Sequence, residues 1–320
     1  MTPIVVSYAS SRSGRGLLGL ALIVLVAACD RGADGRSISV DGGGEANQYE
    51  VRDDAGRVVR LPGPAQRIVS LLPATTETLG ALGAIDRLVA RTDFDDPELS
   101  WLPSVGGGLT PNIELVASLS PDLVIAWEEA GEARVRPRLE AIGIPVLAVA
   151  TRDTAGVFAN IDRLGVLTGL TERADSLAAR MREELADVRA SVAGREPRRV
   201  LYLIGVDPPM VAGPNVFIGE VLEVSGGLNV FSDLQAPSPQ VSMEEILRRQ
   251  PEVVLHPATG ASTASAESLQ TMPGWRELLQ SGETRFVALP PDVLHRPGPS
   301  IVEAAWTLRN AIYPELRRPE

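Results

Sequence analysis

The sequence predicts an α/β protein with two Rossmann-like lobes of parallel sheet, joined by a single long backbone helix. Three observations carry this prediction. Short apolar strands alternate with helices, which is the order typical of parallel βαβ units. A long amphipathic helix is predicted near the middle of the chain, and the pattern of the first half recurs in the second. The length of 320 residues also suits two domains of ordinary size.

The first 28 residues are predicted to be a signal peptide. Arg12 and Arg15 precede the apolar run 17–28. As a helix this run reaches about 18 Å, too short for a hydrocarbon core of about 30 Å. Small residues lie directly before Cys29, the one cysteine of the chain, and this pattern resembles a bacterial lipoprotein box. The resemblance implies cleavage before Cys29 and lipid on that residue. The alternative is an ordinary signal peptide with an incidental cysteine.

Residues 29–47 are predicted to form a flexible tether, because they are rich in Gly and Asp and poor in apolar residues. The first lobe is predicted over 48–155 and begins with a β-hairpin over 48–61. Strands and helices then alternate. The strands are expected over 67–72, 88–91, 123–127 and 145–149, and the helices over 75–82, 113–119 and 134–142.

Linking helices are predicted over 156–196. The first is expected over 156–167. The second, over 171–192, repeats its apolar residues in steps of three and four, so that they form one face. A helix of this length spans about 33 Å, which suits a rigid spine between two lobes. The second lobe is predicted over 197–320.

The second lobe repeats the first. The strand that begins at Arg199 parallels the strand that begins at Arg67, and segment 244–251 parallels segment 114–121. Each segment runs from Glu to Pro over seven positions, and the Glu follows the strand Arg by 47 residues in one half and 45 in the other. Ligands of open α/β sheets lie beyond the carboxyl ends of the strands. Two such edges therefore predict a small-molecule site between the lobes.

Composition excludes several classes of function. The formal net charge is −11, which argues against a nucleic-acid-binding protein. One cysteine and two histidines exclude a multi-Cys zinc site and leave little material for a histidine-based metal cluster. The sequence has no Gly-x-Ser-x-Gly or His-Glu-x-x-His motif, and without any Lys it has no phosphate-binding Gly-x-x-x-x-Gly-Lys. We therefore predict no catalysis, no cofactor and no resident metal, with an α/β metal-chelatase-type enzyme as the weakest alternative.

Several segments together resemble the periplasmic binding proteins of ABC importers for cobalamin, haem and iron–siderophores. They are RIVSLLPATTETLGALG at 67–83, PNIELVASLSPDLVIAW at 111–127, GVDPPMVAG at 205–213, PQVSMEEIL at 239–247 and HRPGPSIVEAA at 295–305. The resemblance covers roughly 51–313, and the cobalamin-binding members match these segments best. It implies a helical-backbone binding protein, in lipoprotein form, with a clamp of limited motion.

The resemblance also implies partners and a location. The protein is expected to be a monomer that captures a cobalt or iron chelate and delivers it to an ABC permease and its ATPase. Its expected place is periplasmic or otherwise extracytoplasmic, lipid-anchored at Cys29, with Asp30 resembling a retention signal for the cytoplasmic membrane. The alternative is a binding lipoprotein for an oxyanion or a small metal complex, using helix N-termini with Thr75, Thr76 and Ser300.

Glu114 and Glu244 match the positions at which the resembled family docks onto permease arginines, one glutamate from each lobe. The internal repeat places them at equivalent points, as a two-fold symmetric permease requires. The alternative interpretation is that both are helix-N-terminal acids favoured by the macrodipole, by about 0.3–1 kcal/mol each. The two interpretations are compatible.

The ligand contacts are also implied by the resemblance. The candidates are Trp127, Phe94, Met210, Asp292, His295 and Arg296. Trp127 matches an aromatic residue that contacts cobalamin, with core packing as the alternative. Arg296 would pair with an anionic group of the ligand. His295 would ligate haem iron or corrinoid cobalt, with an ordinary surface residue as the alternative.

Most of the aromatic box that would hold a corrin ring is missing. Ser238, Val293 and the glycine run 106–108 stand where the resembled cobalamin-binding proteins have aromatic residues. This weakens the prediction of cobalamin without weakening that of the family. His256 follows a strand and is a further candidate for the ligand metal, against packing or solvent exposure.

Overall fold

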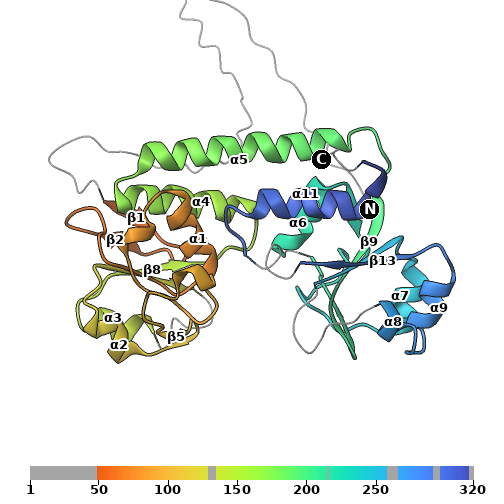
Figure 1. The fold of residues 1–320 in the computed structure, drawn as a ribbon, viewed down its shortest axis with the longest axis horizontal. Coiled ribbons are helices and arrows are strands. Elements are labelled where there is room, and N and C mark those ends of the chain that lie inside the picture. The colour runs from red at the N-terminus through yellow and green to blue at the C-terminus, as the bar shows by residue number, and fades with distance from the viewer. Residues whose placement is uncertain (1–48, 129–134, 215, 258–265, 291–295, 317–320) are drawn as a thin grey trace, which may run out of the picture. The chain divides into compact units, whose positions relative to one another are not determined.

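The computed structural model describes residues 49–128, 135–214, 216–257, 266–290 and 296–316 (Figure 1). The predicted signal peptide, the tether and Cys29 lie outside these residues. The described residues belong to one compact unit, Glu45–Glu320. None of the helices described is both long and apolar enough to cross a membrane.

The first lobe is built on a four-stranded parallel sheet with the order β4-β3-β7-β8. Its strands are β3 (Ile68–Ser70), β4 (Leu88–Ala90), β7 (Leu123–Trp127) and β8 (Val146–Val149). They are almost completely buried, as expected for parallel strands whose two faces are covered. The predicted hairpin precedes them as β1 (Glu50–Arg52) and β2 (Val58–Arg60), which pair antiparallel.

Short helices surround this sheet. They are α1 (Pro73–Ala81), α2 (Ile113–Ser118) and α3 (Arg136–Glu140), with single 3-10 turns at Ile85–Arg87 and Pro97–Leu99 and a two-residue ladder, β5 (Gly106–Gly107) with β6 (Thr110–Pro111). The helices and strands predicted for this lobe are confirmed, although α3 ends two residues earlier than expected. The small β5–β6 ladder was not predicted.

The second lobe has a sheet in which β11, β9, β12 and β13 lie in this order and run parallel. The strands are β9 (Arg198–Val206), β11 (Gly227–Asn229), β12 (Val253–Pro257) and β13 (Arg285–Leu289), and β10 (Pro209–Val211) pairs antiparallel with β9. The helices are α6 (Phe217–Val224), α7 (Met243–Arg249), α8 (Ala266–Leu269), α9 (Trp275–Gln280) and α11 (Ile301–Ile312), followed by a 3-10 turn at Pro314–Leu316.

The predicted repeat is confirmed in both topology and register. The order β4-β3-β7-β8 has its counterpart in β11-β9-β12-β13, and the pair Ile68–Leu123 corresponds to Val200–Val253. The backbone N–H groups of Arg67 and Arg199 donate to Asp122 and Glu252 in the same way, at 3.0 and 2.9 Å. Both lobes thus use one scaffold down to single hydrogen bonds.

The same correspondence holds where the helix over Ile113–Ser118 and the helix over Met243–Arg249 end. Ser120 and Gln250 have φ values of 48° and 46°, and they are the two non-glycine residues described with positive φ. The guanidinium groups of Arg67 and Arg199 donate to the carbonyl oxygens of Ser120 and Gln250, at 3.2 and 2.9 Å. A left-handed residue followed by Pro stops each helix, and the arginine satisfies a carbonyl that the helix leaves without a partner.

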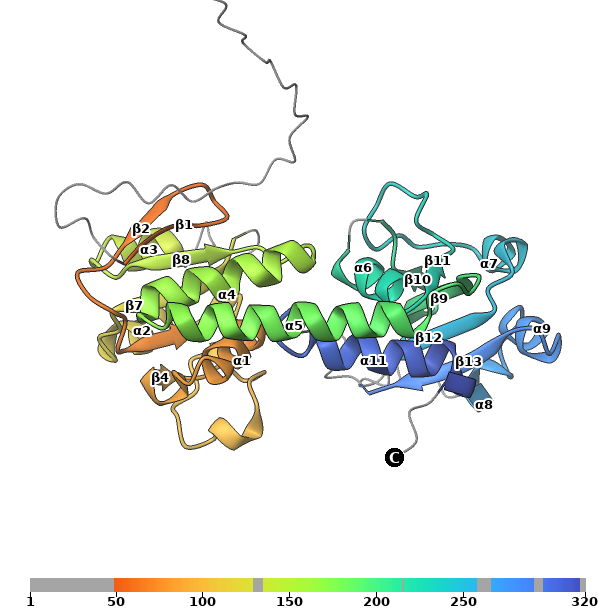
Figure 2. The same cartoon turned by 90° about the horizontal axis from the view of Figure 1, so that it is seen from above.

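The two long helices of the predicted linking segment are α4 (Thr154–Thr168) and α5 (Thr171–Ser191), which lie side by side (Figure 1; Figure 2). Helix α5 contributes to both hydrophobic cores. Leu177 and Met181 are buried in the core of the first lobe, and Val188 is buried in that of the second. Leu185, Phe217 and Trp306 pack against both cores, so that apolar contact is continuous from one lobe to the other.

Two carboxylates form reciprocal polar ties between the lobes. Glu77 on α1 accepts hydrogen bonds from the backbone N–H and hydroxyl of Ser300, at the start of α11, at 2.5 and 3.0 Å. Glu220 on α6 accepts from the backbone N–H and hydroxyl of Thr154, at the start of α4, at 2.7 and 2.6 Å. Each lobe thereby provides an acid for a helix N-terminus of the other, where negative charge is stabilised.

Candidate functional site

The carboxyl ends of the first-lobe strands carry two exposed aromatic residues. Trp127 ends β7 and is 44% exposed, and Phe94 lies in the loop after β4 and is 68% exposed. Each side chain leaves apolar surface in water, and both lie beyond the strands of one sheet, where ligands of α/β proteins bind. Core packing of Trp127, the alternative interpretation, is therefore wrong.

The glycine run 106–108 shapes the surface beside Phe94. A Cβ at Gly108 would lie 2.0 Å from the carbonyl oxygen of Leu71, and a Cβ at Gly107 would lie 3.7 Å from the Phe94 ring. Position 108 therefore accepts only glycine, because any side chain there would collide with the backbone that follows β3. An aromatic residue at that position is excluded by this close approach.

The second-lobe candidates are only partly described. Met210 lies on β10, half-buried, within van der Waals reach of a Cβ placed at Gly205. Arg296 is half-buried, and its charge opposes the effect of burial, which raises the pKa of Glu77. Asp292 and His295 lie outside the described residues. Of the predicted contacts that the structure describes, Trp127 and Phe94 lie at the carboxyl ends of the first-lobe strands, and Met210 and Arg296 lie in the second lobe.

His256 is a core residue. It is 1% exposed, its Nδ1 lies 3.0 Å from the carbonyl oxygen of Leu203, and its ring packs near Phe286. These contacts make the ring part of the packing of the second lobe. The packing interpretation of His256 is confirmed.

The hydroxyl groups predicted for an oxyanion site are already used by the fold. Thr75 Oγ1 lies 2.6 Å from Ser70 Oγ, and Thr76 Oγ1 donates to the carbonyl of Leu72. Ser300 is bound to Glu77, whose carboxylate occupies the start of α11. An anion at that helix N-terminus would meet a buried negative charge instead of free donors, so this geometry disfavours the oxyanion alternative.

Glu114 and Glu244 are exposed and stand in the first turns of α2 and α7. The helices begin alike: Asn112 and Ser242 are the N-cap residues, and their side-chain oxygens accept from backbone N–H groups at 3.0 and 3.1 Å. Among the described residues neither carboxylate forms an ion pair or accepts a hydrogen bond. The structure therefore presents one unneutralised carboxylate at equivalent positions of the two lobes.

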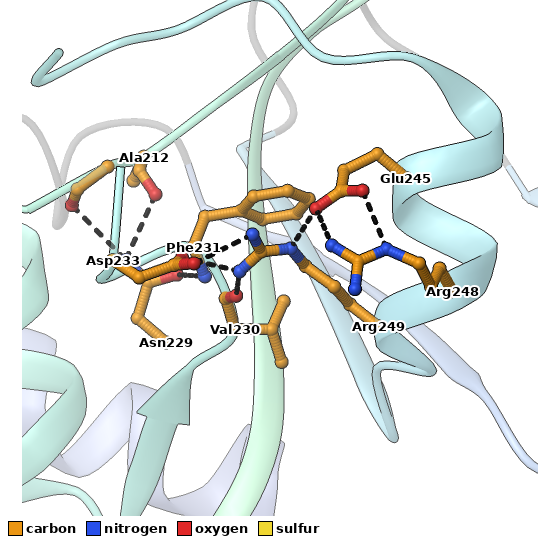
Figure 3. Close-up of polar contacts among 9 residues, drawn as sticks. Ala212, Asn229, Val230, Phe231, Asp233, Glu245, Arg248 and Arg249 are labelled. Carbon is orange, nitrogen blue, oxygen red and sulfur yellow. Dashed lines mark hydrogen bonds and ion pairs between the residues drawn. The ribbon is translucent and has the colours of Figure 1, made fainter. Parts of the chain in front are cut away.

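Figure 3 shows a polar network that includes Glu245, the residue after Glu244 in the chain. This network was not predicted. Glu245 accepts from Arg248 at 2.6 and 2.9 Å and from Arg249 at 2.6 Å. These hydrogen bonds, the larger share from Arg248, lower the pKa of Glu245 to about 2. Arg249 also binds Asp233, whose pKa is lowered by that contact. The spacing of 245, 248 and 249 on a helix was the available sequence signal, whereas Asp233 comes from a different element.

The described residues contain no group of three or more His, Cys, Asp or Glu side chains that could hold a metal ion. One shallow hollow is lined by Tyr49, Gly169 and Arg173, and another by Arg60, Arg136 and Pro145. Neither hollow includes a residue predicted to contact the ligand.

Comparison with known proteins decides the family. A family model described as periplasmic binding protein matches residues 68–293, which is more than half of the chain. This protein belongs to the periplasmic binding protein family. Members of this family are substrate-binding proteins of transport systems and not enzymes, as the sequence predicted.

Named members of the periplasmic binding protein family are similar to this chain over most of its length. The vitamin B12-binding protein of Vibrio cholerae serotype O1 is 32% identical over 249 residues, covering 76% of this chain and 87% of the relative. The crystal structure of the periplasmic vitamin B12 binding protein of Vibrio cholerae matches with a TM-score of 0.66 and 29% identity, over 80% of this chain and 100% of that one. A periplasmic haem-binding protein from Pseudomonas aeruginosa matches with a TM-score of 0.70 and 28% identity, over 80% and 95%.

Proposed function

We propose that this protein binds a metal chelate and delivers it to an ABC permease. The chelate is a corrinoid such as cobalamin, a haem or an iron–siderophore. The observation that carries delivery is the pair Glu114 and Glu244, exposed at equivalent points of a confirmed repeat. The observation that carries the ligand class is the exposed aromatic edge formed by Trp127 and Phe94. The names of the relatives support the same class of cargo.

The proposed recognition is mainly apolar. The flat face of a corrin or porphyrin ring would cover Trp127 and Phe94, which removes their exposed apolar area from water. Arg296 would pair with a carboxylate or phosphate of the ligand by a charge-assisted hydrogen bond. The metal ion travels inside its chelate as cargo, and the protein contributes no catalytic step.

Titration of the chain from Gly42 onward tests the ligand class, since this chain contains the compact unit Glu45–Glu320. Calorimetry and absorption would follow the addition of cyanocobalamin, haemin and a ferric siderophore. We expect submicromolar binding of one of them. Binding of none of the three would contradict the proposed cargo.

A matched pair of variants tests the aromatic edge. Trp127→Ala should weaken binding about tenfold or more without lowering the melting temperature, because Trp127 stacks on the ligand but not in the core. Trp101→Ala is the control, since Trp101 is 64% exposed and has no proposed ligand contact. Equal affinities of the two variants would contradict the role of Trp127.

Charge reversal tests the docking role. Glu114→Arg combined with Glu244→Arg should abolish transport while the ligand affinity of the isolated protein stays unchanged, because like charges would then face the permease arginines. Glu183→Arg combined with Glu184→Arg makes the same change of net charge on the exposed face of α5 and is the control. Normal transport by the first double variant would rule out this docking assignment.

We further propose that lipid on Cys29 anchors the protein to the cytoplasmic membrane, with delivery occurring on its extracytoplasmic side. Several acyl chains give stable anchoring, whereas one chain alone is marginal. Cys29→Ser should release the protein from the membrane fraction and abolish incorporation of labelled palmitate. Persistent labelling of this variant would contradict the assignment.

A further inference from the structure

Helix α7, which carries Glu244, is too short to be stable without tertiary contacts. It has seven residues, or about two turns, and isolated helices shorter than about 12 residues are marginal in water. Ile246 is completely buried on its inner side, and Met243 and Leu247 pack partly buried against the same core. An attachment at the C-terminal end of the helix also fixes its rotation on the core, and with it the direction of Glu244.

Arg249 provides that attachment at the end of α7 (Figure 3). Its Nη2 donates to Asp233 at 2.9 Å, its Nη1 donates to the carbonyl of Val230, and its Nε donates to Glu245 at 2.6 Å. The guanidinium carbon lies 4.5 Å from the centre of the Phe231 ring. The Arg249 side chain is only 14% exposed. Four contacts therefore hold one planar group in a fixed orientation.

The segment that receives Arg249 is itself rigid. Phe231 is completely buried in the core of the second lobe. Asn229 donates to the carbonyl oxygens of Ala212 and Gly213 and accepts from the backbone N–H of Phe231. Arg249 thus connects a short surface helix to a part of the lobe that is fixed by both packing and hydrogen bonds.

The equivalent helix of the first lobe, α2, has apolar contacts in place of this polar attachment. In the repeat, Leu115 and Leu119 occupy the positions of Glu245 and Arg249, and both leucines pack against an apolar core. The polar attachment is therefore specific to the second lobe. It also neutralises Glu245, which leaves Glu244 as the unpaired carboxylate of the α7 first turn.

We propose that Arg249 is a positioning residue for docking: it fixes α7 against segment 229–233 and so sets the direction in which Glu244 meets a cationic group of the permease. This inference rests on the proposed docking function. Arg249 itself does not touch the partner. Its loss should change the affinity for the permease but not the affinity for the ligand.

The test measures the affinity of the ligand-free mature chain for its permease complex in lipid nanodiscs. Arg249→Met should weaken this affinity about tenfold, and Arg249→Lys should weaken it less, because a lysine cannot hold three acceptors in one plane. Arg248→Met removes the same charge from the same helix but only one contact, and should change the affinity less than about twofold. Equal effects of the two methionine variants would overturn the proposal.

A double variant separates positioning from general destabilisation. In a Glu244→Gln background, Arg249→Met should cause little further loss, because the carboxylate that it positions is gone. An undiminished further loss would contradict the proposal. If Glu244→Gln alone leaves the affinity unchanged, the docking function itself fails, and this outcome differs from a failure of Arg249 alone.

Hydrogen exchange provides a measurement that needs no permease. In Arg249→Met the amides of α7 should exchange faster, while those of α2 serve as an unchanged internal control. Asp233→Asn, which changes an exposed residue, is a milder variant that should shift exchange in the same direction if Arg249→Met fails to fold. Unchanged exchange in α7 would show that Arg249 does not fix the helix.

Discussion

The two lobes share a scaffold but differ in how they attach the equivalent helices α2 and α7. Strand order, register, the helix-ending residues Ser120 and Gln250 and the two strand arginines correspond throughout. Both helices pack apolar side chains against a core, but α7 adds the ion network of Arg249 where α2 has two leucines. Backbone topology is therefore the repeated part, and the side-chain attachment has diverged within it.

Equivalent exposed positions in the two lobes therefore do not require the same side-chain contacts beneath them. An apolar attachment is insensitive to salt and pH, whereas an ionic one at the surface is screened by salt. Glu114 and Glu244, which we propose as docking residues, should therefore depend differently on salt.

The first lobe contains a buried ion pair that anchors its hairpin. Arg136 binds Asp53 at 2.6 Å, and these side chains are 2% and 0% exposed, whereas Arg249 of the second lobe binds partly exposed carboxylates. Arg136→Met should lower the free energy of unfolding by about 3–5 kcal/mol, because it leaves a buried unpaired charge. Urea denaturation measures this effect. Arg136→Met combined with Asp53→Asn should recover part of the loss, and no recovery would contradict the electrostatic cause.

The reciprocal ties between the lobes should contribute comparable amounts. Glu77→Ala and Glu220→Ala each leave a helix-terminal N–H and a hydroxyl without their acceptor, so each should lower the free energy of unfolding by about 1–3 kcal/mol. Denaturation curves of both variants test the symmetry. A large effect at one site only would show that the ties are not equivalent.

Glu77 should also make the stability of the fold depend on pH. Burial raises its pKa above 4.5, against the opposing effects of the Ser300 hydrogen bonds and Arg296. The folded state then binds a proton more tightly than the unfolded chain does, so the contribution of Glu77 to stability is greatest below its ordinary pKa and is lost as the pH rises through the raised value. The stability difference between wild type and Glu77→Gln should shift in this direction between acidic and neutral pH. A constant difference would contradict the raised pKa.

The two N-cap residues should contribute equally to the free energy of unfolding. Asn112→Ala and Ser242→Ala each remove one side-chain acceptor at a helix start, and each should lower the free energy of unfolding by about 1 kcal/mol. Thermal unfolding of the two variants measures the effects side by side. A much smaller effect of Ser242→Ala would mean that the Arg249 network compensates for the lost cap.

The smallest expected effects come from the two left-handed residues. Replacing Ser120 or Gln250 with Gly removes side-chain strain at positive φ but adds entropy to the unfolded chain, so a net gain of about 0.5–1 kcal/mol is expected at each position. The two melting temperatures should rise by similar amounts. A rise at only one position would show that the backbones are not equivalent there.

Local patterns in the sequence determined much of this protein. Hydrophobic periodicity predicted the strands and the long helix over 171–192, found as α5 over Thr171–Ser191. The repeat predicted two similar lobes and the equivalent places of Glu114 and Glu244. These features follow from residues near one another in the chain, or from a pattern that occurs twice, so the sequence alone displays them.

Only the tertiary structure decided which distant polar groups meet. Glu77 and Ser300 are separated by 223 residues, and Arg249 and Asp233 lie on different elements. Neither contact leaves a periodic signal, because a hydrogen bond depends on the final placement of two atoms within about 3 Å. The same reason applies to His256, which a strand pattern places at an edge but which packing buries completely. Sequence determined the scaffold and its exposed candidates, and tertiary packing determined how each candidate is held.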